Sequence, residues 1–170
     1  MRRILLAVAL VALTPAVTRA QGAWDLAKKG VGQSAAGGLE KEINKRLLES
    51  GHKNQCSFKS GTAELEAGCG PKADRLAKAL IDAKKKLNGA GVKNFKFVVS
   101  GHTDSTGDAA RNKTLSGERA AVMVKQLVAK GVPADDIESV GMGSDRPLEK
   151  PDDTAAKKAR NRRYEVQVKL

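Results

Sequence analysis

Residues 95–128 read FKFVVSGHTDSTGDAARNKTLSGERAAVMVKQLV, and this stretch decides the fold. Apolar residues recur at every second position from Phe95 to Val99, which is the period of a β-strand. After a loop from Gly101 to Leu115, with Ser116 as the expected N-cap, apolar residues recur at helical spacing. The expected buried stripe of this helix is Ala120, Met123, Val124, Leu127 and Val128. The stretch therefore predicts a strand, a long loop and an amphipathic helix.

Further elements lie on both sides of this stretch. Pro71 and Gly89 bound a predicted helix with one apolar face, made of Ala73, Leu76, Ala77, Leu80, Ile81 and Leu87. Short strands are expected at residues 56–59, 137–140 and 164–170, the last with one polar face. Each helix needs a sheet face on which to bury its stripe. The predicted fold class is α+β, a two-layer β-α-β-α-β sandwich with helices on one face of a small mixed sheet.

Asp104 and Arg119 are the candidate binding residues. Asp104 follows a predicted strand, and open sheets hold ligands beyond the carboxyl ends of strands. Arg119 is expected in the first turn of the next helix, where unpaired N–H groups favour anions. An acid that takes an ammonium beside a guanidinium that grips a carboxylate would complement a zwitterion, with Asn112 bonding from the loop. The spacing leaves open an internal Asp104–Arg119 salt bridge that only pins the loop.

Three separated motifs resemble those of the OmpA-like C-terminal domain, in that family's order. They are GHTDSTGDAARNKTLSGERA (101–120), GMGSDRP (141–147) and NRRYEVQV (161–168), and the resemblance covers roughly residues 54–170. The resemblance implies the same sandwich fold. It also implies noncovalent binding of peptidoglycan through the meso-diaminopimelate of the stem peptide, which would help to tether or organise the cell envelope.

By motif position, the resemblance implies that Asp104 and Arg119 grip the free amino-acid end of diaminopimelate. Supporting residues would be Thr103, Asn112 and one arginine of the Arg162-Arg163 pair. Two places depart from the family pattern. Arg111 stands where an aromatic residue is usual, and Lys157-Lys158-Ala159 stands where an arginine is usual. Both departures change the rim of the expected site rather than its central pair.

The N-terminus carries an export signal by its composition. Residues 1–20 combine Arg2 and Arg3 with a short apolar run and a small-residue ending, as a secretory signal peptide does; an uncleaved anchor is the alternative. We therefore expect a periplasmic protein, with or without association with the outer membrane. Residues 21–53 are expected to form a flexible lead-in with a short amphipathic helix at 39–50. Packing on the domain is its default role, and residues 21–50 are the candidate contact with an outer-membrane or other envelope protein.

The two cysteines, Cys56 and Cys69, are expected to form one disulfide, because an even count in an exported chain favours pairing. No metal centre is expected, since His52 and His102 are the only histidines. No cofactor or catalytic activity is expected either, because the phosphate-loop, HExxH and GxSxG motifs do not occur.

Charge suggests an alternative function. Without the three arginines of residues 1–20, the chain keeps 28 basic and 19 acidic residues, a net charge of +9. A secreted basic protein that binds anionic lipid or nucleic acid is therefore the alternative. Nucleic acid is the weaker partner, because the whole chain has only five aromatic residues for base stacking.

Overall fold

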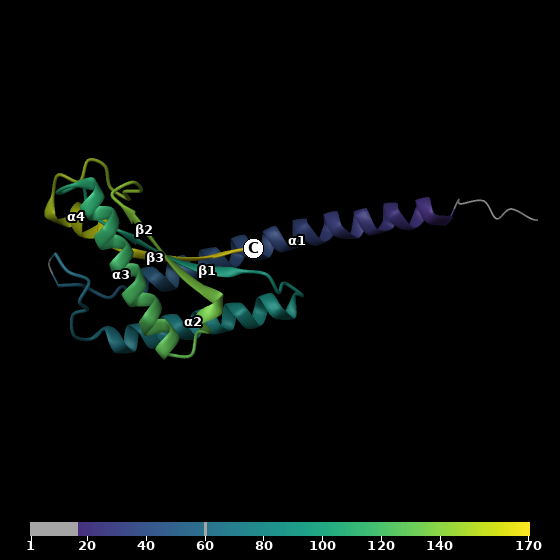
Figure 1. Ribbon diagram of the computed structural model, residues 1–170, viewed down its shortest axis with the longest axis horizontal. Coiled ribbons are helices and arrows are strands. Elements are labelled where there is room, and N and C mark those ends of the chain that lie inside the picture. The colour runs from purple at the N-terminus through teal and green to yellow at the C-terminus, as the bar shows by residue number, and fades with distance from the viewer. Residues whose placement is uncertain (1–16, 60) are drawn as a thin grey trace, which may run out of the picture. The chain divides into compact units, whose positions relative to one another are not determined.

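The computed structural model describes residues 17–59 and 61–170, with side chains from residue 35 onward (Figure 1). Its elements, in chain order, are α1 (Val17–Lys53), α2 (Cys69–Gly89), β1 (Lys96–His102), α3 (Ala109–Ala129), a 3₁₀ turn η1 (Ala134–Asp136), β2 (Ile137–Gly143), α4 (Ala155–Asn161) and β3 (Tyr164–Lys169). The sheet, the disulfide and the cleft described below belong to the second of two units, residues 36–170. Within the described range, no helix is long and apolar enough to cross a membrane.

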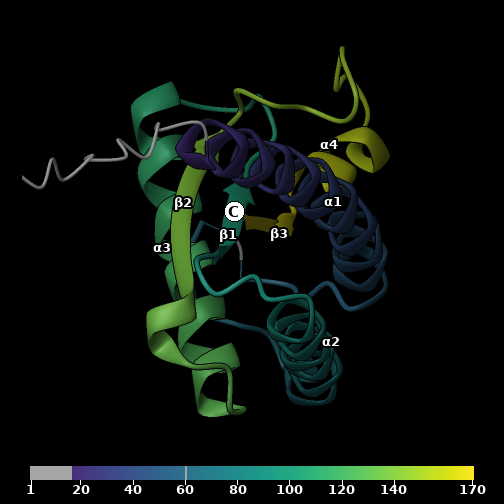
Figure 2. The ribbon, with the colours of Figure 1, turned by 90° about the vertical axis from the view of Figure 1, so that its right-hand side faces the viewer.

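The sheet is mixed, as predicted, with β1 between β2 and β3 (Figure 2). β1 runs parallel to β2, so that Phe97 lies opposite Ile137, and antiparallel to β3, so that Val99 lies opposite Val166. The last strand alternates as the sequence predicts: Tyr164, Val166 and Val168 are buried and the residues between them are not.

One face of the sheet carries the core. Phe97 and Val99 of β1 are fully buried in a single apolar cluster with residues of three helices. The helical members include Ile43 and Leu47 of α1, Leu76, Leu80 and Leu87 of α2, and Ala120, Met123 and Leu127 of α3. Burying one such leucine or isoleucine side chain contributes about 1.5–3 kcal/mol. The two-layer sandwich is confirmed. The predicted helix stripes are buried except at Ile81, Val124 and Val128, which are partly buried against the core.

The predicted disulfide is present between Cys56 and Cys69, whose Cα atoms lie 5.1 Å apart. It joins Cys56, which follows the end of α1, to the first residue of α2 and closes residues 57–68 into a segment. The segment is also tied to β3, because the Cys56 N–H donates to the Tyr164 hydroxyl at 3.2 Å. Burial raises the pKa of Tyr164 to about 12, so this hydroxyl stays protonated at neutral pH.

The strand predicted at residues 56–59 is wrong. The only pairing there is a single antiparallel bridge between Phe58 and Leu65, and both residues belong to the closed segment. The Lys59 N–H donates to the Glu64 carbonyl at 2.9 Å and the Glu66 N–H to the Ser57 carbonyl at 3.0 Å. The backbone of this segment therefore pairs with itself and leaves the sheet with three strands.

α1 is longer than the helix predicted at residues 39–50, because it runs from Val17 to Lys53 and includes Gly51. A glycine inside a helix costs about 1 kcal/mol relative to alanine, and burial of Ile43 and Leu47 offsets that cost near the helix end. Residues 21–38, predicted as a lead-in, fall within this helix. The signal peptide predicted at residues 1–20 lies mostly outside the described residues and, like the domain boundary at residue 54, stays a prediction.

α3 begins earlier than predicted, and Ser116 is not its N-cap. The cap is Asp108, whose side chain accepts from the Arg111 N–H at 2.8 Å. Ser116 is buried within the helix, where its hydroxyl accepts from the Gly143 N–H at 2.8 Å. The loop after β1 is therefore Thr103–Asp108, shorter than the fifteen residues expected.

Glycines allow α3 to lie directly on the sheet. A Cβ atom at Gly101 would come within 2.1 Å of the Ser116 carbonyl oxygen, and one at Gly141 within 2.4 Å of the Lys113 oxygen. Residue 101 must therefore be glycine because the backbone of α3 approaches the strand too closely to leave room for a Cβ atom. This contact sets the depth at which the side chains of α3 meet the loop after β1.

Candidate functional site

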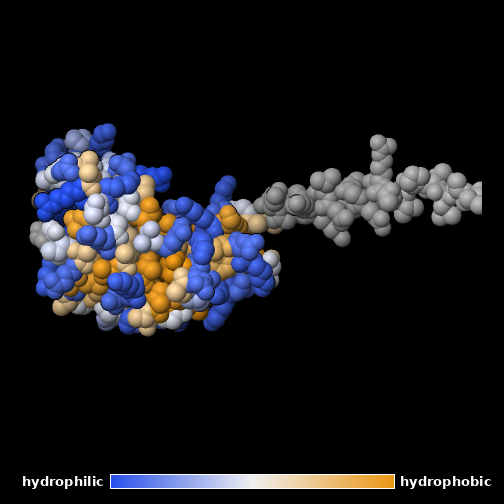
Figure 3. All heavy atoms as spheres, viewed as in Figure 1, coloured by the Kyte–Doolittle hydropathy of each residue, from blue (hydrophilic) through white to orange (hydrophobic). Residues whose placement is uncertain are grey.

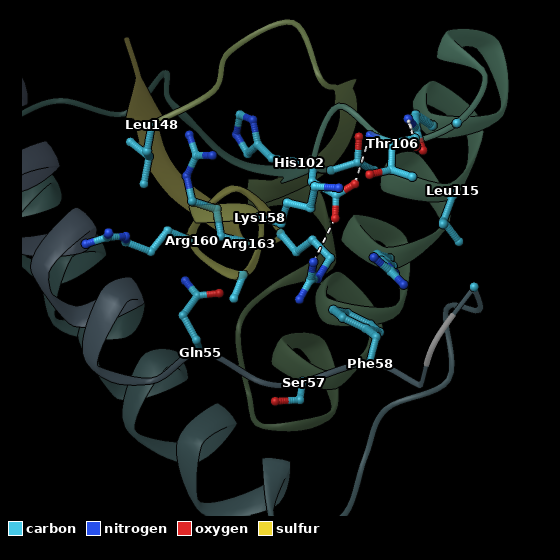
Figure 4. A pocket seen from close by; sticks show the side chains of 18 of the residues that line it. Gln55, Ser57, Phe58, His102, Thr106, Leu115, Leu148, Lys158, Arg160 and Arg163 are labelled. Carbon is cyan, nitrogen blue, oxygen red and sulfur yellow. Dashed lines mark hydrogen bonds and ion pairs between the residues drawn. The ribbon is translucent and has the colours of Figure 1, made fainter. Parts of the chain in front are cut away.

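A cleft of about 1250 Å³ opens beyond the carboxyl end of β1. Its walls come from the Thr103–Asp108 loop, α3, α4 with the residues after it, the end of α1 with the residues after it, and the disulfide-closed segment (Figure 4). All six binding residues predicted from the sequence line it: Thr103, Asp104, Asn112, Arg119, Arg162 and Arg163. The structure therefore gathers into one cavity residues that lie up to 60 positions apart in the chain.

The Asp104 carboxylate is held in place by two donors. Arg162 donates from Nη1 to Oδ2 at 2.7 Å, and the Thr106 N–H donates to Oδ1 at 3.0 Å. The carboxylate is largely enclosed, with 13% of its side chain exposed. Burial raises the pKa of Asp104, but the hydrogen bonds from Arg162 and Thr106 outweigh it and bring the pKa below its usual value. Asp104 is therefore negatively charged at neutral pH.

Arg119 is not in the first turn of α3, because the helix begins ten residues earlier. The N–H groups of the helix start therefore do not assist it, contrary to the expectation from sequence. Its Nε donates to the Thr62 carbonyl at 2.9 Å and one Nη to the Lys59 carbonyl at 3.5 Å. Its guanidinium carbon also lies 5.2 Å from the centre of the Phe58 ring, within the range of a cation–π contact.

The alternative of an internal Asp104–Arg119 salt bridge is not what the structure contains. Asp104 forms its ion pair with Arg162, and among the described residues Arg119 has no carboxylate within ion-pair distance. The two charges nevertheless act on one another. Burial and nearby Arg162 lower the pKa of Arg119, whereas Asp104 raises it. A positive and a negative group thus share the cleft without neutralising each other by direct contact.

Asn112 and Thr103 shape the loop that carries Asp104. Asn112 is buried, and its amide donates to the Thr106 carbonyl at 3.0 Å. The Thr103 N–H donates to the Gly143 carbonyl at 2.9 Å, which ties the loop to the end of β2. The Thr103 hydroxyl is buried without a hydrogen-bond partner. Both residues therefore lie where they fix the backbone on either side of Asp104.

The Arg162-Arg163 pair divides between two tasks. Arg162 faces the cleft and contacts Asp104 with 46% of its side chain exposed. Arg163 is 7% exposed and turns to Glu165, with its Nη2 2.6 Å from the carboxylate, and it also donates to the Asn161 and Arg146 carbonyls. Arg162 is thus the member of the pair that meets the candidate binding carboxylate, and Arg163 holds the backbone at the start of β3.

His102 lies at the end of β1 with both ring nitrogens buried, and neither has a hydrogen-bond partner among the described residues. Burial and the charge of Arg163 lower its pKa to about 4, although Glu165, 3.9 Å from Nε2, acts in the opposite direction. The ring is therefore neutral at pH 7. Among the residues that the structure describes, no cluster of histidine, cysteine or acidic side chains is suited to hold a metal ion.

Asp152 and Asn161 support the site, and residue-type reasoning missed both. Asp152 accepts from the Ser105 N–H at 2.9 Å and from the Asn161 amide at 3.0 Å. The Ser105 hydrogen bonds, with help from Asn161, lower the pKa of Asp152 to about 2. Asn161 is the first residue of the third sequence motif, which could have indicated its role. Asp152 lies in a polar stretch outside the three motifs, and nothing in the sequence indicated its role. Together they brace the Asp104 loop against α4.

Cations outnumber acids around the cleft. Its lining includes Arg111, Arg119, Lys158, Arg160, Arg162 and Arg163, against Glu66, Asp104 and Asp108. Arg160 is paired with Glu149 at 3.2 Å, and Arg162 with Asp104. Arg111 and Lys158 are the two places where the chain departs from the resembled pattern. The arrangement favours a ligand that carries carboxylates and at least one ammonium group.

Figure 3 shows one face of the molecule, on which hydrophilic residues surround an apolar strip that lies between α3 and α2. Val124 and Val128 of α3 and Ile81 of α2 are partly buried against the core. None of these three residues lines the cleft.

The comparisons agree with this architecture. A model of the OmpA family matches residues 57–162, more than half of the chain. The chain is 40% identical over 96 residues to the "Peptidoglycan-binding protein ArfA" of Mycobacterium tuberculosis, which is 56% of this chain and 25% of that protein. The match thus spans about a quarter of that relative's length.

Two solved structures share the fold. The peptidoglycan-associated lipoprotein from Burkholderia pseudomallei is 21% identical, with a TM-score of 0.53 over 66% of this chain and 86% of that one. The cell wall anchor of the T6SS from Pseudomonas aeruginosa is 27% identical, with a TM-score of 0.51 over 65% of this chain and 72% of that one. At 21% identity, the similarity to the Burkholderia lipoprotein concerns the fold alone.

Proposed function

This chain belongs to the OmpA family, and from that premise we propose that residues 54–170 bind peptidoglycan noncovalently through the meso-diaminopimelate of its stem peptide. The observation that carries the proposal is the relation of Asp104 to Arg119. Both are charged, both line one cleft, and each is held by neighbours other than its counterpart. The far end of a diaminopimelate side chain bears an ammonium and a carboxylate on one carbon, so it offers the complementary pair.

In this proposal the ligand ammonium donates to the Asp104 carboxylate, which stays ionised because Arg162 and Thr106 lower its pKa. The ligand carboxylate accepts from the Arg119 guanidinium, whose planar array of donors suits two-point binding. Arg162 lies beside both groups and supplies a second cation for the same carboxylate. Lysine-type stem peptides have the ammonium but lack the carboxylate, so they should bind more weakly.

The names of two relatives support this ligand. One is called a peptidoglycan-binding protein and the other a cell wall anchor. We further propose that the protein acts in the periplasm, where it tethers or organises the envelope, and that residues 21–50 contact an outer-membrane or other envelope protein. Binding without catalysis suits the site, because an acid whose pKa is lowered is a poor general acid.

An anionic lipid or polymer is the second candidate ligand, and the excess of cations around the cleft favours it. The two candidates differ in their response to salt. Charge-driven binding to a polyanion falls steeply as salt rises, whereas a zwitterion bound by an enclosed pair should lose little affinity. Binding that collapses between 50 and 200 mM salt would favour the polyanion.

The test is cosedimentation with isolated sacculi. Asp104→Ala and Arg119→Ala should each weaken binding by roughly 10- to 100-fold, as expected for the loss of hydrogen bonds to a charged group. Asp145→Ala and Lys113→Ala are matched controls, because they make the same charge changes at an exposed ion pair outside this cleft. Undiminished sedimentation of the first two variants would refute the proposed site.

A further inference from the structure

We propose that the disulfide-closed segment, residues 57–68, positions Arg119 for its ligand, with Phe58 as the main positioning residue. The inference rests on the proposed function, since Arg119 is the carboxylate-binding group only there. Neither cysteine is required for the binding chemistry itself. What the closed segment supplies is a fixed direction for a guanidinium that would otherwise be free to move.

Among the described residues, the hydrogen bonds and the cation–π contact of the Arg119 side chain are made with this segment. The Thr62 and Lys59 carbonyls accept from it, and its guanidinium carbon lies over the Phe58 ring, 5.2 Å from the ring centre. These partners stand 57 or more positions before Arg119 in the chain. A free arginine side chain loses much rotational entropy when it is fixed. A guanidinium that is already held in place should therefore bind a carboxylate more tightly than a mobile one.

The same contacts leave donors for a ligand. A guanidinium has five N–H groups, and the two carbonyls use one on Nε and one on an Nη nitrogen. The remaining donors can therefore meet a carboxylate without breaking the contacts with the segment. In this arrangement the segment and the ligand share Arg119 rather than compete for it.

The segment depends on its closure because it is not a strand of the sheet. Its pairing is internal, through the Phe58–Leu65 bridge and the ion pair of Lys59 with Glu64. The disulfide fixes its two ends, at Cys56 and at the first residue of α2. Opening the disulfide would remove the covalent link between the two ends of the segment that contacts the Arg119 side chain, while the apolar cluster of α2, α3 and the sheet would remain.

Phe58→Leu tests this with little disturbance, because it keeps an apolar side chain against the core and removes the ring that faces the guanidinium. Phe95→Leu is the matched control, since Phe95 packs on Phe97 and does not line the cleft. We expect Phe58→Leu to weaken binding of a soluble diaminopimelate-containing tripeptide by about threefold to tenfold, and Phe95→Leu to leave it unchanged. The Cys56→Ala/Cys69→Ala variant should lose about tenfold at a temperature where circular dichroism shows it folded.

If Phe58 and the disulfide only stabilised the fold, their effect on binding would be the same with or without Arg119. In the Arg119→Ala background, Phe58→Leu and the cysteine variant should therefore weaken binding no further. In the absence of ligand, the Arg119 Nε–H signal in NMR should be ordered in the wild type and in Phe95→Leu, and averaged by motion in Phe58→Leu. This second readout holds even if the cysteine variant fails to fold.

The inference is overturned if Phe58→Leu binds as the wild type does, or if its loss adds in full to that of Arg119→Ala. An Arg119 signal that stays ordered in Phe58→Leu would also overturn it. These results differ from failure of the proposed function, in which the wild type itself would not bind the tripeptide while its Arg119 signal still depended on Phe58.

Discussion

Arg162 donates to the Asp104 carboxylate at 2.7 Å, and this contact joins the residue after α4 to the loop after β1. It lowers the pKa of Asp104 and places a second guanidinium at the candidate site. Its neighbour Arg163 points to Glu165 instead. Substitution of Arg162 should therefore change ligand binding, whereas substitution of the adjacent Arg163 should change the stability of the fold.

Removal of Arg162 should affect ligand binding more than stability. In Arg162→Ala, the pKa of Asp104 should rise toward its usual value, so binding should be lost at a higher pH as acid is added. Arg163→Ala should instead lower the free energy of unfolding by about 3 kcal/mol or more, because it leaves enclosed Glu165 without its partner. Binding to sacculi between pH 3 and 7, with denaturant unfolding of both variants, checks this. Equal effects of the two substitutions on both measurements would contradict it.

The buried His102 should make the fold sensitive to mild acid. Its folded pKa of about 4 lies below the 6.5 of an ordinary histidine, so its contribution to stability is complete above pH 6.5 and is lost as the pH falls toward 4. Between pH 7 and 4.5 the wild type should lose about 2 kcal/mol more than His102→Leu. Parallel pH profiles of wild type and His102→Leu would rule this out.

Gly101→Ala should damage the fold severely. The added Cβ would lie 2.1 Å from the Ser116 carbonyl oxygen, which is backbone and cannot turn aside. We expect a loss of about 3 kcal/mol or more in the free energy of unfolding. Gly117→Ala, on α3 next to Ser116, is the control, because its Cβ would meet only Gly141 backbone atoms at 3.7 Å. It should be neutral or stabilising by up to about 1 kcal/mol, and a Gly101→Ala protein as stable as this control would be unexpected.

Arg111 should contribute through charge alone. It is exposed at the rim of the cleft, and no ion pair holds its side chain among the described residues. Arg111→Gln should weaken binding to sacculi by about twofold to threefold at low salt and have no effect above 0.5 M salt, because exposed charges are screened. Lys125→Gln on the same helix, away from the cleft, should change nothing at either salt concentration. An effect of Arg111→Gln that persists at high salt would indicate a direct, enclosed contact.

Sequence periodicity was sufficient for the parts of the fold that bury one continuous face. The stripe from Leu76 to Leu87 and the alternation from Tyr164 to Val168 each repeat with a fixed period, and both are buried as predicted except for Ile81, which is partly buried. The start of α3 could not be found in this way. Asp108 and Ser116 are both good N-cap residues, and the choice between them depends on how closely α3 approaches Gly101 and Gly141.

The sequence predicted which residues form the candidate site but not the contacts that hold them in place. Family motifs led to Asp104, Arg119 and Arg162, which do share one cleft. Nothing in the local sequence indicated that Phe58 and Thr62 would hold Arg119, because the segment has no periodic pattern and is placed by a disulfide and by tertiary contacts. Such partners become visible only when the chain is folded.

Competition for sacculi gives the most direct test of the central claim, that separate charges on Asp104 and Arg119 clasp one amino-acid head group. Free meso-diaminopimelate and free L-lysine would be titrated, at constant ionic strength, against wild-type protein bound to diaminopimelate-type sacculi. Diaminopimelate should release the protein at a concentration at least tenfold below that of lysine, and the difference should vanish for protein that still binds after Arg119→Ala. Release by both amino acids at the same concentration, or by neither, would contradict the account.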